Sequence, residues 1–180
     1  MCIRDRLYEA LVARCGGTAS AEELSQRHFR LVCQMLEEYR VGPMPGLEEA
    51  LDALRRRGIP FGVVSSSWRW YVERCLRELG MYEDAAVIVT GSDGLPLKPA
   101  PAPYQAAARV FRPAPPGAVL AVEDSGSGVR SAVAAGLACA AVYNPDSGAQ
   151  DLSPARWRLN SLYELPALLD GCLLYTSPSP

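Results

Sequence analysis

Short apolar runs without polar alternation constrain the fold of this chain more than any other feature. Phe61–Val64 is such a run, and Ala86–Val89, Val119–Val122 and Ala138–Val142 repeat the pattern. A strand with one wet face carries polar residues at every second position, so these runs predict strands covered on both faces. Segments of helical periodicity separate them. The sequence therefore predicts an α/β fold with a doubly wound parallel sheet.

The helices between these strands are predicted from apolar residues at helical spacing and from the glycines and prolines that follow them. Their predicted ranges are Leu47–Arg57, Tyr71–Leu79, Tyr104–Phe111, Gly128–Ala135 and Leu162–Leu169. Each lies between or beside the apolar runs, as the crossovers of a parallel sheet require.

The first part of the chain has a different organisation, because two helical patterns follow one another with no strand between them. The first is Leu7–Cys15, and the second begins after Ser20, which forms a capping-box pattern with Glu23. The prolines and glycines of Val41–Gly46 then indicate a linker. We expect a helical segment over residues 7–42 and an α/β core over residues 43–171.

The two ends of the sequence do not resemble the rest. MCIRDR at the start and CLLYTSPSP at the end resemble peptides translated from sequencing-library adaptor DNA. We therefore expect residues 1–6 and 172–180 to be non-native additions outside the fold, and the genuine start of the protein to be missing.

Composition excludes several classes of function. Hydrophobic residues make up 49% of the chain and the net charge is −2, so neither nucleic acid nor a membrane is an expected partner. No apolar run approaches the roughly 20 residues that cross a bilayer, and no signal-peptide pattern is present. We expect a cytoplasmic protein of unknown oligomeric state. The six scattered cysteines form no C-x-x-C pair and are expected to be buried thiols.

Polar side chains follow three of the predicted strands. Ser65–Ser67 comes after the first, and Lys98, the only lysine among 18 basic residues, lies in the loop after the second. Glu123 and Asp124 come directly after the third. Because ligands bind outside the carboxyl ends of parallel strands, these groups are expected to converge at one edge of the sheet.

Each group also has a plainer interpretation. The serines could cap a helix, the lysine could be a solvated surface charge, and the acids could favour a helix N-terminus. Together they indicate more, because paired carboxylates suit Mg²⁺ while hydroxyls and an ammonium suit phosphate. Cation and phosphate in one place indicate phosphoryl transfer. No activated nucleophile follows any of these strands.

Taken in order, these residues resemble the haloacid dehalogenase superfamily. The motifs are Ser65 after its apolar run, K-P-x-P-x-x-Y from Lys98, and E-D-S-x-x-G from Glu123. The similarity covers nearly all of residues 7–169 and is greatest to the branch that holds β-phosphoglucomutase and phosphoglycolate phosphatase. It implies a Rossmann-like core that lacks its first strand, with residues 7–42 as the remnant of a helical cap.

The resemblance also implies roles for individual residues. Ser65 and Lys98 would be catalytic, and both would bind the phosphoryl group together with Ser66 and Ser67. Asp124 would ligate Mg²⁺ directly, with Glu123 as a second ligand or a water-mediated partner. The family's first motif, D-x-D-G-T, is absent. Its first aspartate is the nucleophile that forms an aspartyl-phosphate, so we expect truncation to have removed it and left the chain inactive.

The implied function is a Mg²⁺-dependent phosphatase acting on a small phosphorylated metabolite. A sugar phosphomutase of the same family would share every motif present, and a non-catalytic phosphate-binding relative would keep the motifs without the nucleophile. A bacterial receiver domain is disfavoured by the order of serine, lysine and acids. A true dehalogenase is disfavoured because its chemistry does not need the metal that the acid pair implies.

Overall fold

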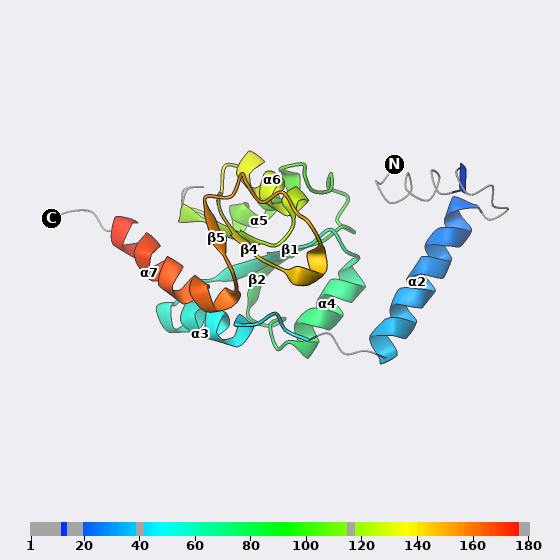
Figure 1. Cartoon of the computed structure of the whole chain (residues 1–180), viewed down its shortest axis with the longest axis horizontal. Helices are drawn as coiled ribbons and strands as arrows, with labels where there is room; N and C mark the ends of the chain where they lie inside the picture. The colour runs from blue at the N-terminus through cyan, green and yellow to red at the C-terminus, as the bar shows by residue number, and fades with distance from the viewer. Residues whose placement is uncertain (1–11, 14–19, 39–41, 115–117, 177–180) are drawn as a thin grey trace. The chain divides into compact units, whose positions relative to one another are not determined.

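A computed structural model of the chain describes residues 12–13, 20–38, 42–114 and 118–176 (Figure 1). The chain divides between Gly42 and Pro43 into two compact units. This division lies within the segment that was predicted to be a linker. The two units are described separately below.

In the first unit, helix α2 spans Ala21–Glu38. The predicted capping box at its start is confirmed: the Ser20 N–H donates to Glu23 Oε2 at 2.7 Å, and the Glu23 N–H donates to Ser20 Oγ at 3.2 Å. The predicted helix over residues 7–15 lies outside the described residues except for Val12 and Ala13, which are helical. That this unit is part of a cap stays a prediction.

The second unit alternates strands and helices, as the sequence predicts. In chain order its elements are α3 (Leu47–Arg57), β1 (Phe61–Val64), α4 (Arg69–Glu78), β2 (Ala85–Val89), α5 (Ala102–Ala108), the 3₁₀ turn η1 (Arg109–Phe111), β3 (Leu120–Glu123), α6 (Gly126–Ala134), β4 (Ala138–Val142), η3 (Pro145–Ser147), β5 (Trp157–Leu159), η4 (Leu162–Glu164) and α7 (Leu165–Thr176).

Apart from the 3₁₀ turns and shifts of a few residues at element ends, two of these elements differ from the expectation. Strand β5 was not predicted, because a strand of three residues is too short to show a period. Helix α7 continues past residue 171, where the fold was expected to end, and its backbone is helical to Thr176. No proline follows Pro166 until Pro178, so no strong helix breaker interrupts this stretch.

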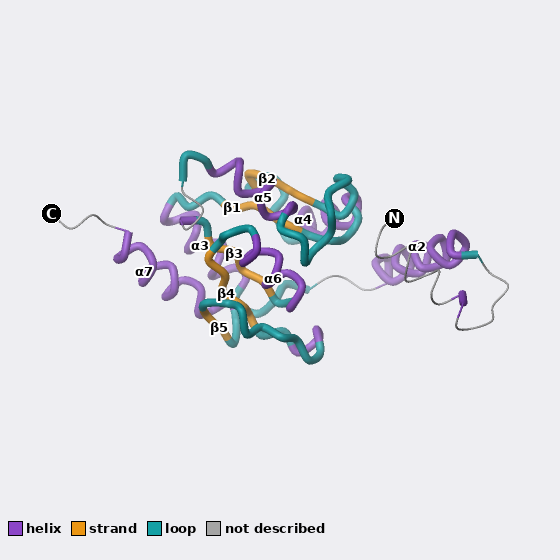
Figure 2. Tube along the Cα trace, turned by 90° about the horizontal axis from the view of Figure 1, so that it is seen from above, coloured by secondary structure: helices purple, strands orange, loops and turns teal. Residues whose placement is uncertain are grey.

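All described strand pairs are parallel, which confirms the α/β class. Strand β1 pairs with β2, and β3, β4 and β5 pair in that order. The resemblance implied a core that lacks one strand, and the described strands form two separate sheets, which Figure 2 shows apart. Strands β1 and β3 each have one edge without a partner among the described strands.

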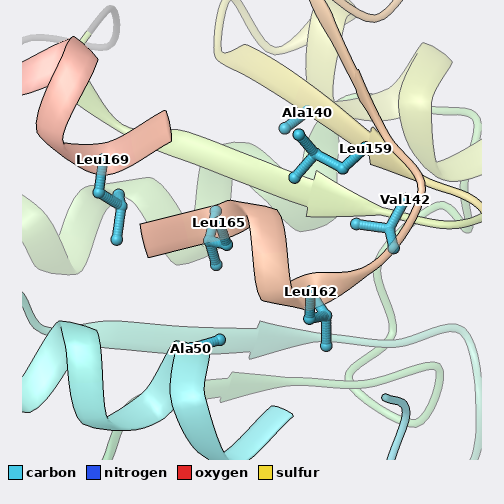
Figure 3. Packing of buried hydrophobic residues seen from close by; sticks show 7 residues of the cluster. All are labelled: Ala50, Ala140, Val142, Leu159, Leu162, Leu165 and Leu169. Atoms are coloured by element: carbon cyan, nitrogen blue, oxygen red, sulfur yellow. The ribbon is translucent and has the colours of Figure 1, made fainter. Parts of the chain in front are cut away.

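Helices cover both faces of the β3–β4–β5 sheet, as expected for a doubly wound fold. Successive residues of β4 belong to different apolar clusters, because side chains of a strand alternate between faces. Ala140 and Val142 pack toward α3 and α7 (Figure 3), whereas Cys139 and Ala141 pack toward α5 and α6. This explains why the β4 sequence is apolar at every position.

Candidate active site

A cavity of about 450 Å³ lies at the carboxyl ends of β1 and β3. Five of the six predicted site residues line it, from two strands and a loop: Ser65, Ser66, Lys98, Glu123 and Asp124. Ser67 does not line the cavity. The structure therefore brings together the groups that the sequence spreads over 60 positions, except for one of the three serines.

Lys98 connects the two sheets at this edge. Its ammonium donates to the Val64 carbonyl at 2.9 Å, at the end of β1, and to the Glu123 carboxylate, at the end of β3. Only 9% of its side chain is exposed. The single lysine of the chain is therefore a buried charge with a fixed position, and a surface role is excluded.

The Glu123 carboxylate accepts hydrogen bonds from three side chains around this edge of the sheet. One oxygen accepts from Lys98 and from the Tyr104 hydroxyl on α5, and the other accepts from Ser125 Oγ at 3.2 Å. Burial raises the pKa of Tyr104, and the charge of Glu123 raises it further, so the phenol stays a donor. Gly128 lies against the same carboxylate, because a Cβ atom there would overlap Glu123 Oε2.

Asp124 has a different environment from its neighbour. Its Oδ2 atom accepts from Asn144 Nδ2 at 2.8 Å and from Ser147 Oγ at 3.0 Å. Within the described part of the chain, Oδ1 accepts no hydrogen bond, and no lysine or arginine forms an ion pair with this carboxylate. An uncompensated carboxylate oxygen at a cavity fits a hard divalent cation such as Mg²⁺.

The described residues offer this cation few protein ligands. They contain no group of three or more His, Cys, Asp or Glu side chains that could hold a metal. Mg²⁺ commonly takes one or two carboxylates and completes its shell with water and substrate phosphate. Asp124 with an open cavity beside it fits that pattern. The described residues do not form a dedicated metal cage.

The serine loop (residues 65–67) continues β1 into the cavity wall. The Ser65 N–H donates to the Val89 carbonyl at 2.9 Å and extends the pairing of β1 with β2. Ser65 Oγ accepts the Ser67 N–H at 3.1 Å, and the Ser67 carbonyl accepts the Gly91 N–H at 2.9 Å. The Ser67 backbone thus fixes the loop, while the Ser65 hydroxyl keeps its proton for a ligand.

Three residues of this site were missed by sequence reasoning. Tyr104 was noted in its motif but given no role, and Asn144 and Ser147 were not noticed. The signal that marks Ser65 and the acid pair, a polar residue just past a buried strand, is also present after Ala138–Val142. Asn144 stands two residues beyond that strand and would have been found there.

Comparison with known proteins decides the family. Residues 7–136 match the haloacid dehalogenase-like hydrolases. The chain belongs to this family. The resemblance inferred from the motifs is thereby confirmed, and the chain is a hydrolase of the haloacid dehalogenase type.

No helix in the described residues combines the length and apolarity needed to span a membrane.

The similar proteins carry phosphatase names. The chain is 33% identical to "Putative phosphatase YhcW" of Bacillus subtilis, over 92% of the chain and 74% of that protein. It is 31% identical to the phosphoglycolate phosphatase of Xylella fastidiosa, over 71% of the chain and 55% of that protein. These matches support a phosphatase, and the chain spans only part of each relative.

A solved structure has a similar fold. CbbY from Rhodobacter sphaeroides, crystallised in complex with phosphate, superposes with a TM-score of 0.72 at 26% identity. The superposition covers 83% of this chain and 67% of that one. A mutant of the same protein was crystallised with xylulose-(1,5)bisphosphate.

Proposed function

We propose that the protein to which this chain belongs is a Mg²⁺-dependent phosphatase that hydrolyses a small phosphorylated metabolite through an aspartyl-phosphate. The convergence of Ser65, Lys98 and Asp124 on one cavity supports this proposal most directly. A hydroxyl donor and a fixed ammonium would hold the phosphoryl group and neutralise its charge. Bound at Asp124, Mg²⁺ would supply further positive charge to the phosphate oxygens.

We propose further that the nucleophile comes from a strand outside this chain. Among the residues that the structure describes, Asp124 is the only aspartate that lines the cavity, and its environment suits a metal ligand. The free edges of β1 and β3 could each pair with one more strand, and Lys98 already connects their carboxyl ends. A carboxylate at the end of such a strand would lie beside the Lys98 ammonium, which would keep it ionised and offset its repulsion from the phosphate.

A phosphatase is favoured over a phosphomutase by the names of the relatives. The relatives from Bacillus subtilis and Xylella fastidiosa, 33% and 31% identical, are both named as phosphatases. The names of the relatives and the ligands of CbbY suggest that the substrate is a small phosphate ester. A cytoplasmic location stays a prediction.

The test is phosphate release by the complete protein that contains this chain. We expect inorganic phosphate to be released from small phosphate esters only when Mg²⁺ is present. The Asp124→Asn variant should need much more Mg²⁺ while its affinity for the ester changes little. If both forms need the same Mg²⁺ concentration for activity, Asp124 is not a ligand of the cation. A complete protein without an aspartate on the added strand would be a phosphate-binding relative instead of an enzyme.

A further inference from the structure

We propose that the loop after β4 positions the Asp124 carboxylate for its cation. This loop, residues 143–150, is called the clasp here. It would fix the rotation of the carboxylate so that Oδ2 stays bound to the protein and Oδ1 stays available at the cavity. The proposal rests on the proposed function, in which Asp124 is a cation ligand.

The contacts of the clasp with Asp124 are selective for one oxygen. Asn144 Nδ2 and Ser147 Oγ both donate to Oδ2, at 2.8 and 3.0 Å. Two donors on one oxygen define the plane of the carboxylate as well as its place. Asn144 is itself oriented, because its Oδ1 accepts the Asp146 N–H at 3.0 Å. The amide group therefore presents its NH₂ side to Asp124.

A second attachment holds the clasp to the helix that follows Asp124. Gln150 Nε2 donates to the Ser147 carbonyl at 2.7 Å, and Gln150 Oε1 accepts the Gly126 N–H at 2.9 Å. Position 126 has no room for a side chain, since a Cβ atom there would stand 2.9 Å from the Asp151 carbonyl oxygen. The clasp is thus hydrogen-bonded both to the Asp124 carboxylate and to the backbone of Gly126, two residues further along the chain.

The chemistry of these donors distinguishes Asp124 from Glu123. Glu123 is neutralised by an ammonium, whereas Asp124 receives only an amide and a hydroxyl. Neutral donors orient a carboxylate and leave its negative charge for a metal. Partners of this kind around metal ligands commonly change metal affinity by about 10–100-fold when they are removed. A loop that merely closed the fold would have no reason to leave the charge uncompensated.

The experiment compares two nearly isosteric replacements in the full 180-residue chain. Ser147→Thr keeps the hydroxyl, and Ser147→Val replaces it with a methyl group. Mn²⁺ serves as the probe, and the signal of free Mn²⁺ in electron paramagnetic resonance gives its affinity. We expect Ser147→Val and Asn144→Ala to weaken Mn²⁺ binding by about 10-fold or more. Ser147→Thr should remain close to the unmodified chain.

Two controls remove the same chemical groups elsewhere. Asn160→Ala deletes an amide that donates to Glu164 at 3.1 Å, and Ser153→Ala deletes a hydroxyl that donates to Asp151 at 2.7 Å. Neither should change Mn²⁺ affinity. Urea unfolding of every variant separates a loss of affinity from a loss of structure. If Asn144→Ala unfolds, the Thr and Val variants of Ser147 still decide the question.

The outcomes separate this proposal from the proposed function. If Mn²⁺ binding depends on Asp124 but Ser147→Val and Asn144→Ala bind as tightly as the unmodified chain, the clasp is not a positioning device and the function stands. If Asp124→Asn binds Mn²⁺ as well as the unmodified chain, the metal assignment fails and the clasp proposal fails with it.

Discussion

Glu123 and Asp124 are adjacent in sequence but have different surroundings. Glu123 ends β3, and its side chain points to the face covered by α5 and α6, where Tyr104 and Gly128 enclose it. The next residue points the other way, because successive side chains of an extended chain alternate. Asp124 therefore meets the loop after β4 and the cavity. A carboxylate that is buried with a cation, as Glu123 is, suits a structural role. A carboxylate oxygen without a described hydrogen-bond donor, as in Asp124, suits a metal ligand.

The buried pair of Lys98 and Glu123 predicts an unusual pattern of stability. Lys98→Met should lower the free energy of unfolding by about 3–5 kcal/mol, because it leaves a carboxylate that is only 6% exposed without its cation. Adding Glu123→Gln should recover most of this loss. In the complete protein Lys98→Met should reduce turnover by several orders of magnitude, and adding Glu123→Gln should not restore it. Urea unfolding and phosphate release measure the two effects. Unchanged stability in Lys98→Met would contradict the buried-charge argument.

Cys139 should be chemically silent in the folded chain. Burial raises the pKa of its thiol to about 11, and Glu123 adds to the effect while Lys98 opposes it. Only 1% of the residue is exposed. We expect no alkylation by iodoacetamide at pH 8 and rapid alkylation in urea, because the thiolate is the reactive form. Mass spectrometry of the digested protein gives the result for this cysteine separately. Labelling in the native state would show that β4 opens.

At the scale of elements, the loop after β2 supports the serine loop. Position 91 has no space for a side chain, because a Cβ atom there would overlap the Ser66 carbonyl oxygen and stand 3.1 Å from that of Ser67. Gly91→Ala must therefore displace the serine loop. We expect affinity for inorganic phosphate, measured by ³¹P NMR, to fall by about 10-fold, as the loss of one charged hydrogen bond would cause.

A matched glycine gives the control for this prediction. Gly80 has a left-handed φ of 65°, and nothing lies within 4 Å of its missing Cβ atom. Gly80→Ala should cost stability through backbone strain and leave phosphate affinity unchanged. Similar phosphate affinities in the two variants would show that Gly91 does not act on the serine loop.

The same loop is held by an ion pair whose strength should depend on pH. Burial alone would raise the pKa of Asp93, but hydrogen bonds from the Thr90 N–H, Arg69 and the Thr90 hydroxyl lower it overall. Its contribution is therefore present above pH 3.8, the ordinary value, and is lost as pH falls through the lowered folded-state pKa. Asp93→Asn should cost about 1–2 kcal/mol at pH 7, and the cost should shrink as the pH falls below 3.8. A pH-independent difference in urea unfolding would contradict this role.

At the scale of the whole second unit, the two sheets should differ in protection. Strand β4 is paired on both sides and almost fully buried, whereas β1 pairs only with β2 and is partly exposed throughout. Hydrogen exchange followed by mass spectrometry should therefore be slowest at β4 and faster at β1. In the complete protein we expect β1 and β3 to gain protection when a strand joins their free edges. Equal protection of β1 in the two forms would argue against a strand at that place.

Much of the fold could be predicted from the sequence, because its signals are local. The boundaries of α3, β1 and β4 were predicted to the residue, since Gly58 and the unbroken apolar runs mark them clearly. The division into two sheets could not be predicted from periodicity, since each strand looks the same whether or not a neighbour is present. Strand β5 was too short to give a pattern.

The sequence by itself determined the α/β class, the succession of most strands and helices along the chain, and the edge at which Ser65, Lys98 and the acid pair would meet. Periodicity and strand-end chemistry are properties of neighbouring residues, so they can be read without coordinates. Only the tertiary structure decided which groups surround each of the two acids. The lysine lies 25 positions from Glu123 and the asparagine 20 positions from Asp124, and packing alone brings each donor to its oxygen.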